Sequence, residues 1–463
     1  MTHDINDKLI AVGQQQLCDH WRQLDLAAQK TLGDQIRKID FATLAQAYSE
    51  PSSENDWLSK LDEIEPAPAV RLSDPNPIET RSQAIATGEA ALAAGKVGMV
   101  LVAGGQGTRL GFPHPKGMFP LGPVSGRTLF EILFEKLRAR AEHHGCEIPL
   151  YLMTSPATHD ETLEFLSKHD WFGLSEGDCR VFCQGTLPAV DAKTGQALLE
   201  SADSLALSPD GHGGMLSAFA ASGCLADAKQ RGVKYLFYCQ VDNPMTSVCD
   251  PGLIGQHILH ESEMTTLVVA KDRPDDRLGN VVRCGDHVQM IEYSELPSEL
   301  AEQRDAEGGL RFWAGSIAVH VFELSFLKRA AAAEDSLPLH RALKKVSHVD
   351  GAGNLVVPDS PNAIKFERFI FDLLPHAKNP IVVEGAREDV FAPVKNAAGE
   401  ATETAITAQQ AMIAKHCRWL LHAGAMVSDG VRVEINPFFA LDESELPEKI
   451  PPETEITEDR YFS

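Results

Sequence analysis

The strongest constraint on the fold is an alternation between residues 97 and 272. Short apolar runs that end in small or polar residues are separated by longer stretches with helical periodicity. This pattern predicts an α/β fold with a largely parallel sheet, in which ligands bind beyond the carboxyl ends of the strands. The apolar runs are VGMVLVAGG (97–105), IPLYLMTS (148–155), CRVFCQ (179–184), KYLFYCQVDN (234–243) and TTLVVAKD (265–272), and the helical stretches include TLFEILFEKLRARAEHH (128–144) and HDETLEFLSKHD (159–170).

Three parts are expected along the chain. Residues 1–95 are polar and helical in pattern, with Leu17, Trp21 and Leu24 on one face, and end in a proline-punctuated linker at 65–80. Residues 96–385 carry the α/β pattern. Residues 386–463 are expected to form a small C-terminal domain with a helix around 407–425, a strand within 431–449 and an acidic tail.

Composition excludes several classes of function. The chain has 463 residues and a formal net charge of −24, which argues against nucleic acid as a partner. No apolar stretch is long enough to cross a membrane, and the first residues do not resemble a signal peptide, so we expect a cytoplasmic protein. The nine cysteines are scattered without a C-x-x-C pair, which favours reduced, mostly buried thiols. A zinc site that uses Cys179, Cys183 and histidines is a weaker alternative.

A glycine-rich loop, VAGGQGTRLGFPHPKG (102–117), follows the first apolar run. It is not a dinucleotide fingerprint, because Leu110 occupies the position of the third glycine, and this argues against an oxidoreductase. It is not a Walker loop either, because Lys116 precedes Gly117. Glycine N–H groups together with Arg109 and Lys116 suit a polyphosphate. The alternative is a tight turn with surface cations.

This loop resembles the signature of nucleotidyltransferases that make UDP-sugars, and most of all the UDP-N-acetylhexosamine pyrophosphorylases of the eukaryotic type. The pattern is G-G-x-G-T-R-L-G followed by P-K-G. Further segments resemble motifs of the same family, in the same order. They are MTSPATHDETLEFL (153–166), QGTLPAVD (184–191), SPDGHGGMLSAF (208–219), QVDNP (240–244), IEYSE (291–295), KFERFIFD (365–372) and EDVFAPVKNAAG (388–399).

The resemblance implies a Rossmann-like, mixed, mostly parallel sheet of the GT-A-like kind. The reaction that it implies is attack by the phosphate oxygen of a sugar 1-phosphate on the α-phosphorus of UTP, which yields a UDP-sugar and pyrophosphate. Such a reaction needs Mg²⁺ and positive charge rather than a covalent nucleophile or a redox cofactor. UTP and a sugar 1-phosphate are therefore the expected partners, and the oligomeric state is left open.

The same resemblance assigns roles to residues that handle phosphate. Arg109, Lys116 and Lys395 are expected to be catalytic, and Asp242 is expected to bind Mg²⁺. Without its motif Lys395 would be an ordinary surface lysine, and Asp242 could instead cap the turn at Asn243 and Pro244. The residues expected to bind the nucleotide are Ala103, Gly104, Gly105, Gly107, Thr108, Gln184, Gly211 and His212.

The expected sugar-binding residues are Gly279, Glu292, Tyr293, Ser316, Phe369 and Phe371. Two alternatives remain at the residue level. His212 could sit in an exposed turn, and the two phenylalanines could belong to a helical apolar stripe with Phe366, Ile370 and Leu373.

Two positions depart from the amino-sugar branch of the family. His212 and Ser316 stand where that branch has Asn, and a His at the first position is similar to glucose-specific relatives. We expect N-acetylglucosamine 1-phosphate as the preferred acceptor. Glucose 1-phosphate or a broad set of sugar phosphates is the alternative, and a non-catalytic nucleotide-sugar sensor is a distant one.

Overall fold

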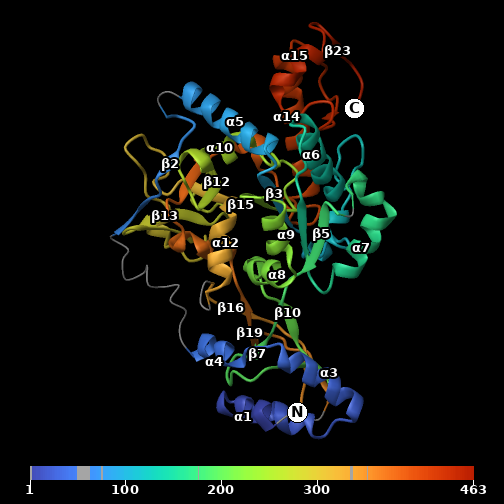
Figure 1. Cartoon of the computed structure of the whole chain (residues 1–463), viewed down its shortest axis with the longest axis vertical. Coiled ribbons are helices and arrows are strands. Elements are labelled where there is room, and N and C mark those ends of the chain that lie inside the picture. The colour runs from blue at the N-terminus through green and yellow to red at the C-terminus, as the bar shows by residue number, and fades with distance from the viewer. Residues whose placement is uncertain (1–2, 50–62, 75–76, 176, 334–336, 352) are drawn as a thin grey trace. The chain divides into compact units, whose positions relative to one another are not determined.

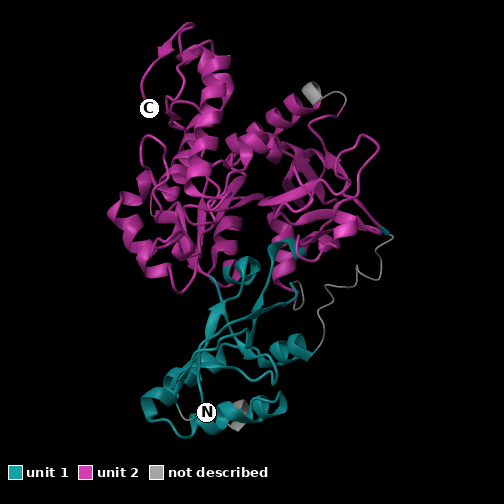
Figure 2. Ribbon diagram, turned by 180° about the vertical axis from the view of Figure 1, so that it is seen from behind, with its two compact units in different colours: residues 1–63, 184–218, 334–372 teal, residues 64–183, 219–333, 373–463 magenta. Residues whose placement is uncertain are grey.

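The computed structural model describes all residues except 1–2, 50–62, 75–76, 176, 334–336 and 352. The chain divides into two compact units (Figure 2). Unit 1 comprises residues 1–63, 184–218 and 334–372, and unit 2 comprises 64–183, 219–333 and 373–463. The expected central domain, 96–385, contributes to both units. The sequence boundaries at 95 and 385 therefore stay a prediction.

A large sheet forms the centre of unit 2 and confirms the predicted α/β class (Figure 1). All five apolar runs become strands. Only β15 on the main path is antiparallel to its neighbours, so the other strands on this path run in one direction. The order is β2 (Ala69–Val70), β20 (Ile381–Glu384), β12 (Met264–Ala270), β15 (Ala314–Glu323), β11 (Tyr235–Gln240), β3 (Val97–Val102), β4 (Leu150–Thr154) and β5 (Cys179–Cys183), with β1 (Ile64–Pro66), β13 (Asn280–Cys284) and β14 (His287–Ile291) attached beside it.

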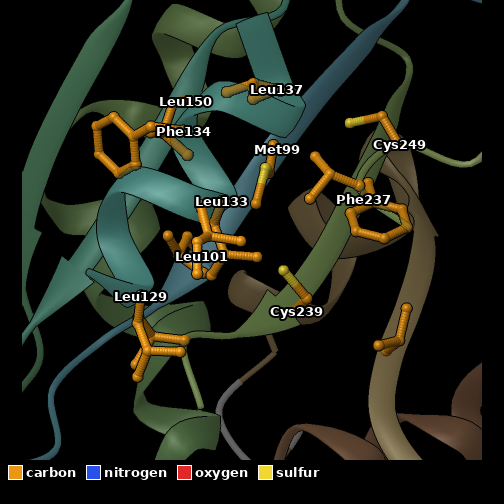
Figure 3. Packing of buried hydrophobic residues seen from close by; sticks show 14 of the residues in the cluster. Met99, Leu101, Leu129, Leu133, Phe134, Leu137, Leu150, Phe237, Cys239 and Cys249 are labelled. Atoms are coloured by element: carbon orange, nitrogen blue, oxygen red, sulfur yellow. The ribbon is translucent and has the colours of Figure 1, made fainter. Parts of the chain in front are cut away.

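Helix α6 (Leu129–His143) illustrates how the helices pack on this sheet. A capping box of Thr128 and Glu131 fixes its start. Leu129, Leu133 and Leu137 recur every four residues and form one buried stripe. Figure 3 shows this stripe beside Met99 and Leu101 of β3 and Leu150 of β4, all in one apolar cluster.

The other helices and short elements of unit 2 surround the same sheet. Gly88 and Gly255 lie where two of these helices, α5 and α10, touch, and a Cβ atom at either residue would clash with the facing backbone. The helices are α5 (Pro77–Ala93), α7 (His159–Lys168), α9 (Cys224–Gln230), α10 (Pro251–Leu259), α11 (Ser298–Ala301), α12 (Leu324–Ala331) and α13 (Arg387–Val390), with the 3₁₀ turns η2 (Thr108–Leu110), η3 (Lys116–Met118) and η4 (Asp170–Gly173).

The C-terminal part of unit 2 has the expected helix and strand. Helix α14 (Ala405–His422) begins at a capping box formed by Thr404 and Thr407. Its last turns pack against a separate apolar cluster that includes Val433 and Phe462. The remaining elements are β21 (Met426–Val427), β22 (Val433–Ile435), η7 (Glu443–Glu445), α15 (Leu446–Lys449), β23 (Glu455–Ile456) and β24 (Arg460–Phe462).

Unit 1 combines the N-terminal helices with short strands from two later segments. Leu17, which is buried, shares a cluster with Trp21 and Leu24 and with Phe366 from the last segment. Leu17 and Trp21 lie on one helix, as the pattern predicts, but Leu24 follows the end of that helix. Its elements are α1 (His3–Ala11), α2 (Gln15–Trp21), α3 (Leu26–Arg37), α4 (Phe41–Ser49), β6 (Thr186–Pro188), β7 (Val190–Asp191), β8 (Leu199–Ser201), β9 (Ser204–Leu205), β10 (Leu207–Pro209), η5 (His212–Gly214), β16 (His340–Lys344), β17 (His348–Val349), β18 (Leu355–Val356) and β19 (Ala363–Glu367); α8 (Met215–Ala221) and η6 (Ile370–His376) continue into unit 2.

Two expectations from the sequence are adjusted here. The segment 65–80 is not simply a linker, because it contributes β2 and the end of β1 to the large sheet. None of the nine cysteines forms a disulfide, and no group of three potential metal ligands occurs in the part of the chain that the structure describes. The zinc alternative therefore has no support there. No helix in the described ranges is long and apolar enough to cross a membrane.

The contact between Gly117 and Phe130 predicts a stability defect. A Cβ atom at Gly117 would clash with the buried Phe130 ring, so Gly117→Ala must displace η3 or α6. We expect the free energy of unfolding to fall by about 1–3 kcal/mol in urea denaturation. Gly105→Ala is the matched control, because no atom lies within 4 Å of its Cβ position. Equal stability of the two variants would contradict this packing.

Candidate functional site

The glycine-rich loop leaves the carboxyl end of β3 and is folded back on itself. The Lys116 N–H donates to the Gly105 carbonyl oxygen (3.0 Å), and the Gly107 N–H donates to that of His114 (2.8 Å). A side chain at Gly107 would meet Phe112 within 2.8 Å, whereas the space above Gly105 is open. The loop therefore needs glycine at 107 for packing, and at 105 it presents bare backbone.

Hydrogen bonds to β4 and to the residue that follows it also hold this loop. The Ala103 N–H donates to the Met153 carbonyl oxygen (2.8 Å), and the Ser155 hydroxyl donates to that of Gly104 (2.7 Å). Among the described residues, no hydrogen bond uses the N–H groups of Gly104, Gly105 or Thr108. Unused N–H groups in a fixed loop are suitable donors for an anion.

Lys116 and Asp242 face each other at this edge of the sheet. Lys116 lies in η3, and Asp242 follows β11, the strand next to β3. The Lys116 Nζ lies 3.6 Å from an Asp242 carboxylate oxygen, and only 16% and 14% of the two side chains are exposed. The structure thus places a cation and a carboxylate together beside the glycine-rich loop.

Backbone hydrogen bonds next to Lys395 hold this residue in the same region. The N–H of the preceding residue, Val394, donates to the Asp242 carbonyl oxygen (2.8 Å). The side chain of Asn243 donates to the Val390 carbonyl oxygen (2.8 Å) and accepts from the Ala392 N–H (3.1 Å). Lys395 itself pairs with Glu403 at 3.5 Å and is 38% exposed.

These contacts decide one alternative from the sequence. The turn at Asn243 and Pro244 is capped by Asn243, whose side-chain oxygen accepts from the Met245 N–H (3.3 Å). The Asp242 carboxylate is directed to Lys116 instead. One carboxylate beside phosphate donors fits Mg²⁺, which takes one or two carboxylates together with phosphate oxygens and waters.

Arg109 differs from the other predicted catalytic residues. It lies in η2, its residue is exposed, and it forms no ion pair with any residue that the structure describes. Its guanidinium is therefore a cation on the outer part of the loop that no described carboxylate neutralises.

Three of the predicted sugar-binding residues lie together in unit 2. The Ser316 N–H donates to the Gly279 carbonyl oxygen (2.9 Å). A Glu292 carboxylate oxygen lies 3.6 Å from the Cβ position of Gly279. Tyr293 follows Glu292 and is 46% exposed.

Ser316 also stabilises a local distortion of β15. The pairing with β12 shifts register here, and Ala318 adopts a positive φ of 56°. The Ser316 hydroxyl oxygen accepts a hydrogen bond from the Ala318 N–H at 3.3 Å. The distortion therefore depends on a side-chain acceptor at position 316.

Lys271 belongs to this region, although the motifs did not identify it. It is 6% exposed and donates to the Asn280 side-chain oxygen (2.5 Å), next to Gly279. Burial lowers the pKa of Lys271. The only sequence signal was its position at the end of the apolar run TTLVVAKD.

Unit 1 holds the other predicted residues, and Gln184 lies against a buried carboxyl group. Its amide Nε2 is 3.4 Å from an Asp210 carboxylate oxygen, and both side chains are buried. Burial raises the pKa of Asp210 to about 6, although the Arg368 charge opposes the shift. These three residues line a cavity of about 530 Å³ within unit 1, together with Lys38 and Thr43.

His212 belongs to an aromatic cluster. Its ring stacks on Phe369 (centroids 5.3 Å apart, planes 21° apart), and its Nδ1 accepts from the Ile370 N–H (3.2 Å). Phe371 lies 5.6 Å from His212. Burial, with a smaller effect from His340, lowers the pKa of His212 to about 4, so the ring is neutral at pH 7.

Two alternatives from the sequence are wrong at this cluster. His212 is not in an exposed turn, because it is half-buried against Phe369. The helical form of the stripe is wrong, because Phe366 lies in strand β19 and only the residues from Ile370 onward enter the 3₁₀ turn η6. Phe371 is nevertheless buried, as the core-packing alternative expects. Gly211 precedes His212 with a positive φ of 86° and packs on the Arg368 backbone, which explains the glycine there.

His340 is a further member that the motifs missed. It lies in β16, its ring centroid is 4.3 Å from that of Phe369, and its Nε2 is 2.7 Å from an Asp372 carboxylate oxygen. Asp372 was visible in KFERFIFD, but its histidine partner lies far away in the sequence. The hydrogen-bonded pair of His340 and Asp372 therefore packs against the aromatic rings of this cluster.

Comparisons with known proteins identify relatives of this chain. The chain is 38% identical to UDP-N-acetylhexosamine pyrophosphorylase-like protein 1 of Xenopus tropicalis, over 90% of this chain and 84% of the relative. It is 33% identical to UDP-N-acetylglucosamine pyrophosphorylase of Saccharomyces cerevisiae, over 94% of both. The crystal structure of the uridine diphosphate N-acetylglucosamine pyrophosphorylase from Trypanosoma brucei, in complex with an inhibitor, superposes with a TM-score of 0.81 at 25% identity, over 99% of each chain.

The family described as UTP–glucose-1-phosphate uridylyltransferase matches residues 39–447. That match includes the glycine-rich loop, Asp242, Lys395 and the predicted sugar-binding residues. The chain belongs to the UTP–glucose-1-phosphate uridylyltransferase family.

Proposed function

We propose that this chain is an Mg²⁺-dependent uridylyltransferase that forms a UDP-sugar and pyrophosphate from UTP and a sugar 1-phosphate, with N-acetylglucosamine 1-phosphate as the favoured acceptor. The observation that carries the proposal is the arrangement in unit 2. Lys116 and Asp242 face each other at 3.6 Å beside a loop with unused N–H groups, and the Asp242 backbone is bonded to the residue before Lys395.

In the proposed reaction, the phosphate oxygen of the sugar 1-phosphate attacks the α-phosphorus of UTP and pyrophosphate leaves. Both reactants are anions, so the protein must neutralise charge and align them. The N–H groups of Gly104 and Gly105 bind phosphate oxygens, and Lys116 and Lys395 stabilise the charge of the departing pyrophosphate. Arg109 supplies a further cation from the outer loop. When bound, Mg²⁺ held by Asp242 supplies additional charge neutralisation.

The base is assigned to the pocket of Gln184 in unit 1. An amide can both donate to and accept from the edge of uracil. Gly185 packs against the Asp210 carboxyl group and Gly211 against the Arg368 backbone, so a side chain at either position would disturb this pocket. The cavity of about 530 Å³ that Gln184 lines is large enough for a small ligand.

The sugar is assigned to Glu292, Ser316 and Gly279 in unit 2. The role of Phe369 and Phe371 of unit 1 as apolar walls for an N-acyl group stays a prediction. The names of the yeast and trypanosome relatives support an amino sugar. His212 and Ser316 favour glucose 1-phosphate as the second candidate. A sensor without activity has less support, because Lys116, Lys395 and Asp242 are all present. We place the activity in the cytoplasm, since the cysteines are free thiols.

The first test compares acceptors. We expect pyrophosphate release with UTP, Mg²⁺ and N-acetylglucosamine 1-phosphate to exceed that with glucose 1-phosphate, and ATP in place of UTP to be inactive. A preference for glucose 1-phosphate would contradict the amino-sugar assignment alone. No release with either sugar phosphate would contradict catalysis.

The second prediction concerns the lysines. Lys116→Ala or Lys395→Ala should lower kcat by two to three orders of magnitude, because lost charge stabilisation in the transition state costs roughly 3–4 kcal/mol. Pyrophosphate release at saturating substrate measures the effect. Lys168→Ala is the matched control, because this lysine is 68% exposed and pairs only with Glu164 on its own helix. Rates near wild type in either variant would remove that lysine from the mechanism.

The third prediction concerns the sugar. Ser316→Asn should raise the ratio of kcat/KM for N-acetylglucosamine 1-phosphate over glucose 1-phosphate about tenfold, which corresponds to one hydrogen bond. The asparagine oxygen can still accept from the Ala318 N–H, so the bulge in β15 is preserved. Ser316→Ala, which lacks that acceptor, controls for a purely structural effect. An unchanged ratio in Ser316→Asn would show that position 316 does not select the sugar.

A further inference from the structure

A second group of cations lies inside unit 2, away from the glycine-rich loop. Lys136 and Arg140 are one turn apart on α6, and Lys415 lies on α14. All three line a small cavity of about 60 Å³, which the loop 244–248 also borders. Arg140 is 4% exposed. The lining has four cations, with Arg127 as the fourth, and two carboxylates.

These three cations have no close ion pair within the described residues, although the carboxylates of Asp389, Asp250 and Asp442 act on Lys415 from a greater distance. Among the described residues, neither Lys136, Arg140 nor Lys415 takes part in an ion pair. The two carboxylates of the lining are already engaged. Glu135 pairs with Arg127, and Glu434 accepts from the backbone of Val124 and Ser125. A chain with a net charge of −24 thus encloses an excess of positive charge here.

The cations are bonded to carbonyl oxygens, which leaves donors unused. Lys136 donates to the carbonyl oxygens of Pro244 (2.5 Å) and Thr246 (3.1 Å), and Arg140 donates to that of Val248 (3.4 Å). Lys415 donates to the carbonyl oxygen of Asp389 (2.8 Å). An ammonium has three donors and a guanidinium has five, so each side chain can bind a further acceptor.

Burial and mutual repulsion make this arrangement costly without a counter-ion. Burial, together with the charges of Lys415 and Arg140, lowers the pKa of Lys136 to about 7. Burial lowers the pKa of Lys415 to about 8, although the charges of Asp389, Asp250 and Asp442 oppose the shift. A bound anion would relieve both effects, because an opposite charge nearby favours the protonated amines.

We propose that the cavity between Lys136, Arg140 and Lys415 binds a free tetrahedral oxyanion of the phosphate class. Its volume is roughly four times the minimum that holds one water, which suits one such ion but leaves no room for a nucleoside. The same three side chains bind the two loops that carry Asp242 and Lys395. An anion bound in this cavity therefore stabilises these loops, whether or not the proposed reaction takes place.

The test measures thermal stability in inorganic phosphate against sodium chloride of equal ionic strength. We expect phosphate to raise Tm by about 2–4 °C in a concentration-dependent manner. The rise should persist in Lys116→Ala, which removes a phosphate ligand of the glycine-rich loop. It should be lost in Lys136→Met and kept in the surface control Lys168→Met. A rise that disappears in Lys116→Ala but persists in Lys136→Met would overturn the proposal.

A second measurement uses the wild-type chain, in case Lys136→Met does not fold. Crystals grown with sodium selenate should show an anomalous peak between Lys136, Arg140 and Lys415. Peaks confined to the glycine-rich loop would overturn the proposal. Neither readout requires activity, so failure of the proposed function would be recognised separately.

Discussion

The hydrogen bonds that join the chain around Asp242 to residues 390–394 are the constraint that holds the segment before Lys395 at the edge of the sheet. They connect segments 147 positions apart in the sequence, so no local propensity can form them. Asp242 and Asn243 are fixed because they follow β11, a central strand of the sheet. Residues 390–394 have little regular structure of their own. The carbonyl and amide groups of Asp242 and Asn243 and the packing of Val394 in the apolar cluster give them a defined position.

This dependence separates what the sequence could predict from what it could not. The strands were predictable because an apolar run of about six residues bounded by polar ones has few alternatives in a chain with buried α/β patterning. The position of Asp242 followed from β11 for the same reason. Lys395 was found only through its motif, because no periodicity around it indicates that it returns to the sheet edge.

Unit 1 shows a second reason why the sequence could not predict every contact. His340 and Phe369 are neighbours because β16 and β19 pair as antiparallel strands, and pairing between short strands is set by tertiary context rather than by local pattern. The apolar spacing around Phe369 matched a helix by chance. Lys271 was missed for a related reason, since a lysine at the end of a strand is usually exposed and only the structure shows that it is buried beside Asn280.

The bond between Gln184 and Asp210 has a consequence for the choice of base. A carboxylate accepts only, so one N–H of the Gln184 amide is turned to Asp210, and its second N–H and its oxygen are left for other partners. Under the proposed assignment, that oxygen can accept from the N3–H of uracil. Cytosine has an unprotonated acceptor at the same ring position, and two acceptors repel. A single buried carboxyl group behind the glutamine would thus discriminate between two pyrimidine nucleotides of nearly equal size.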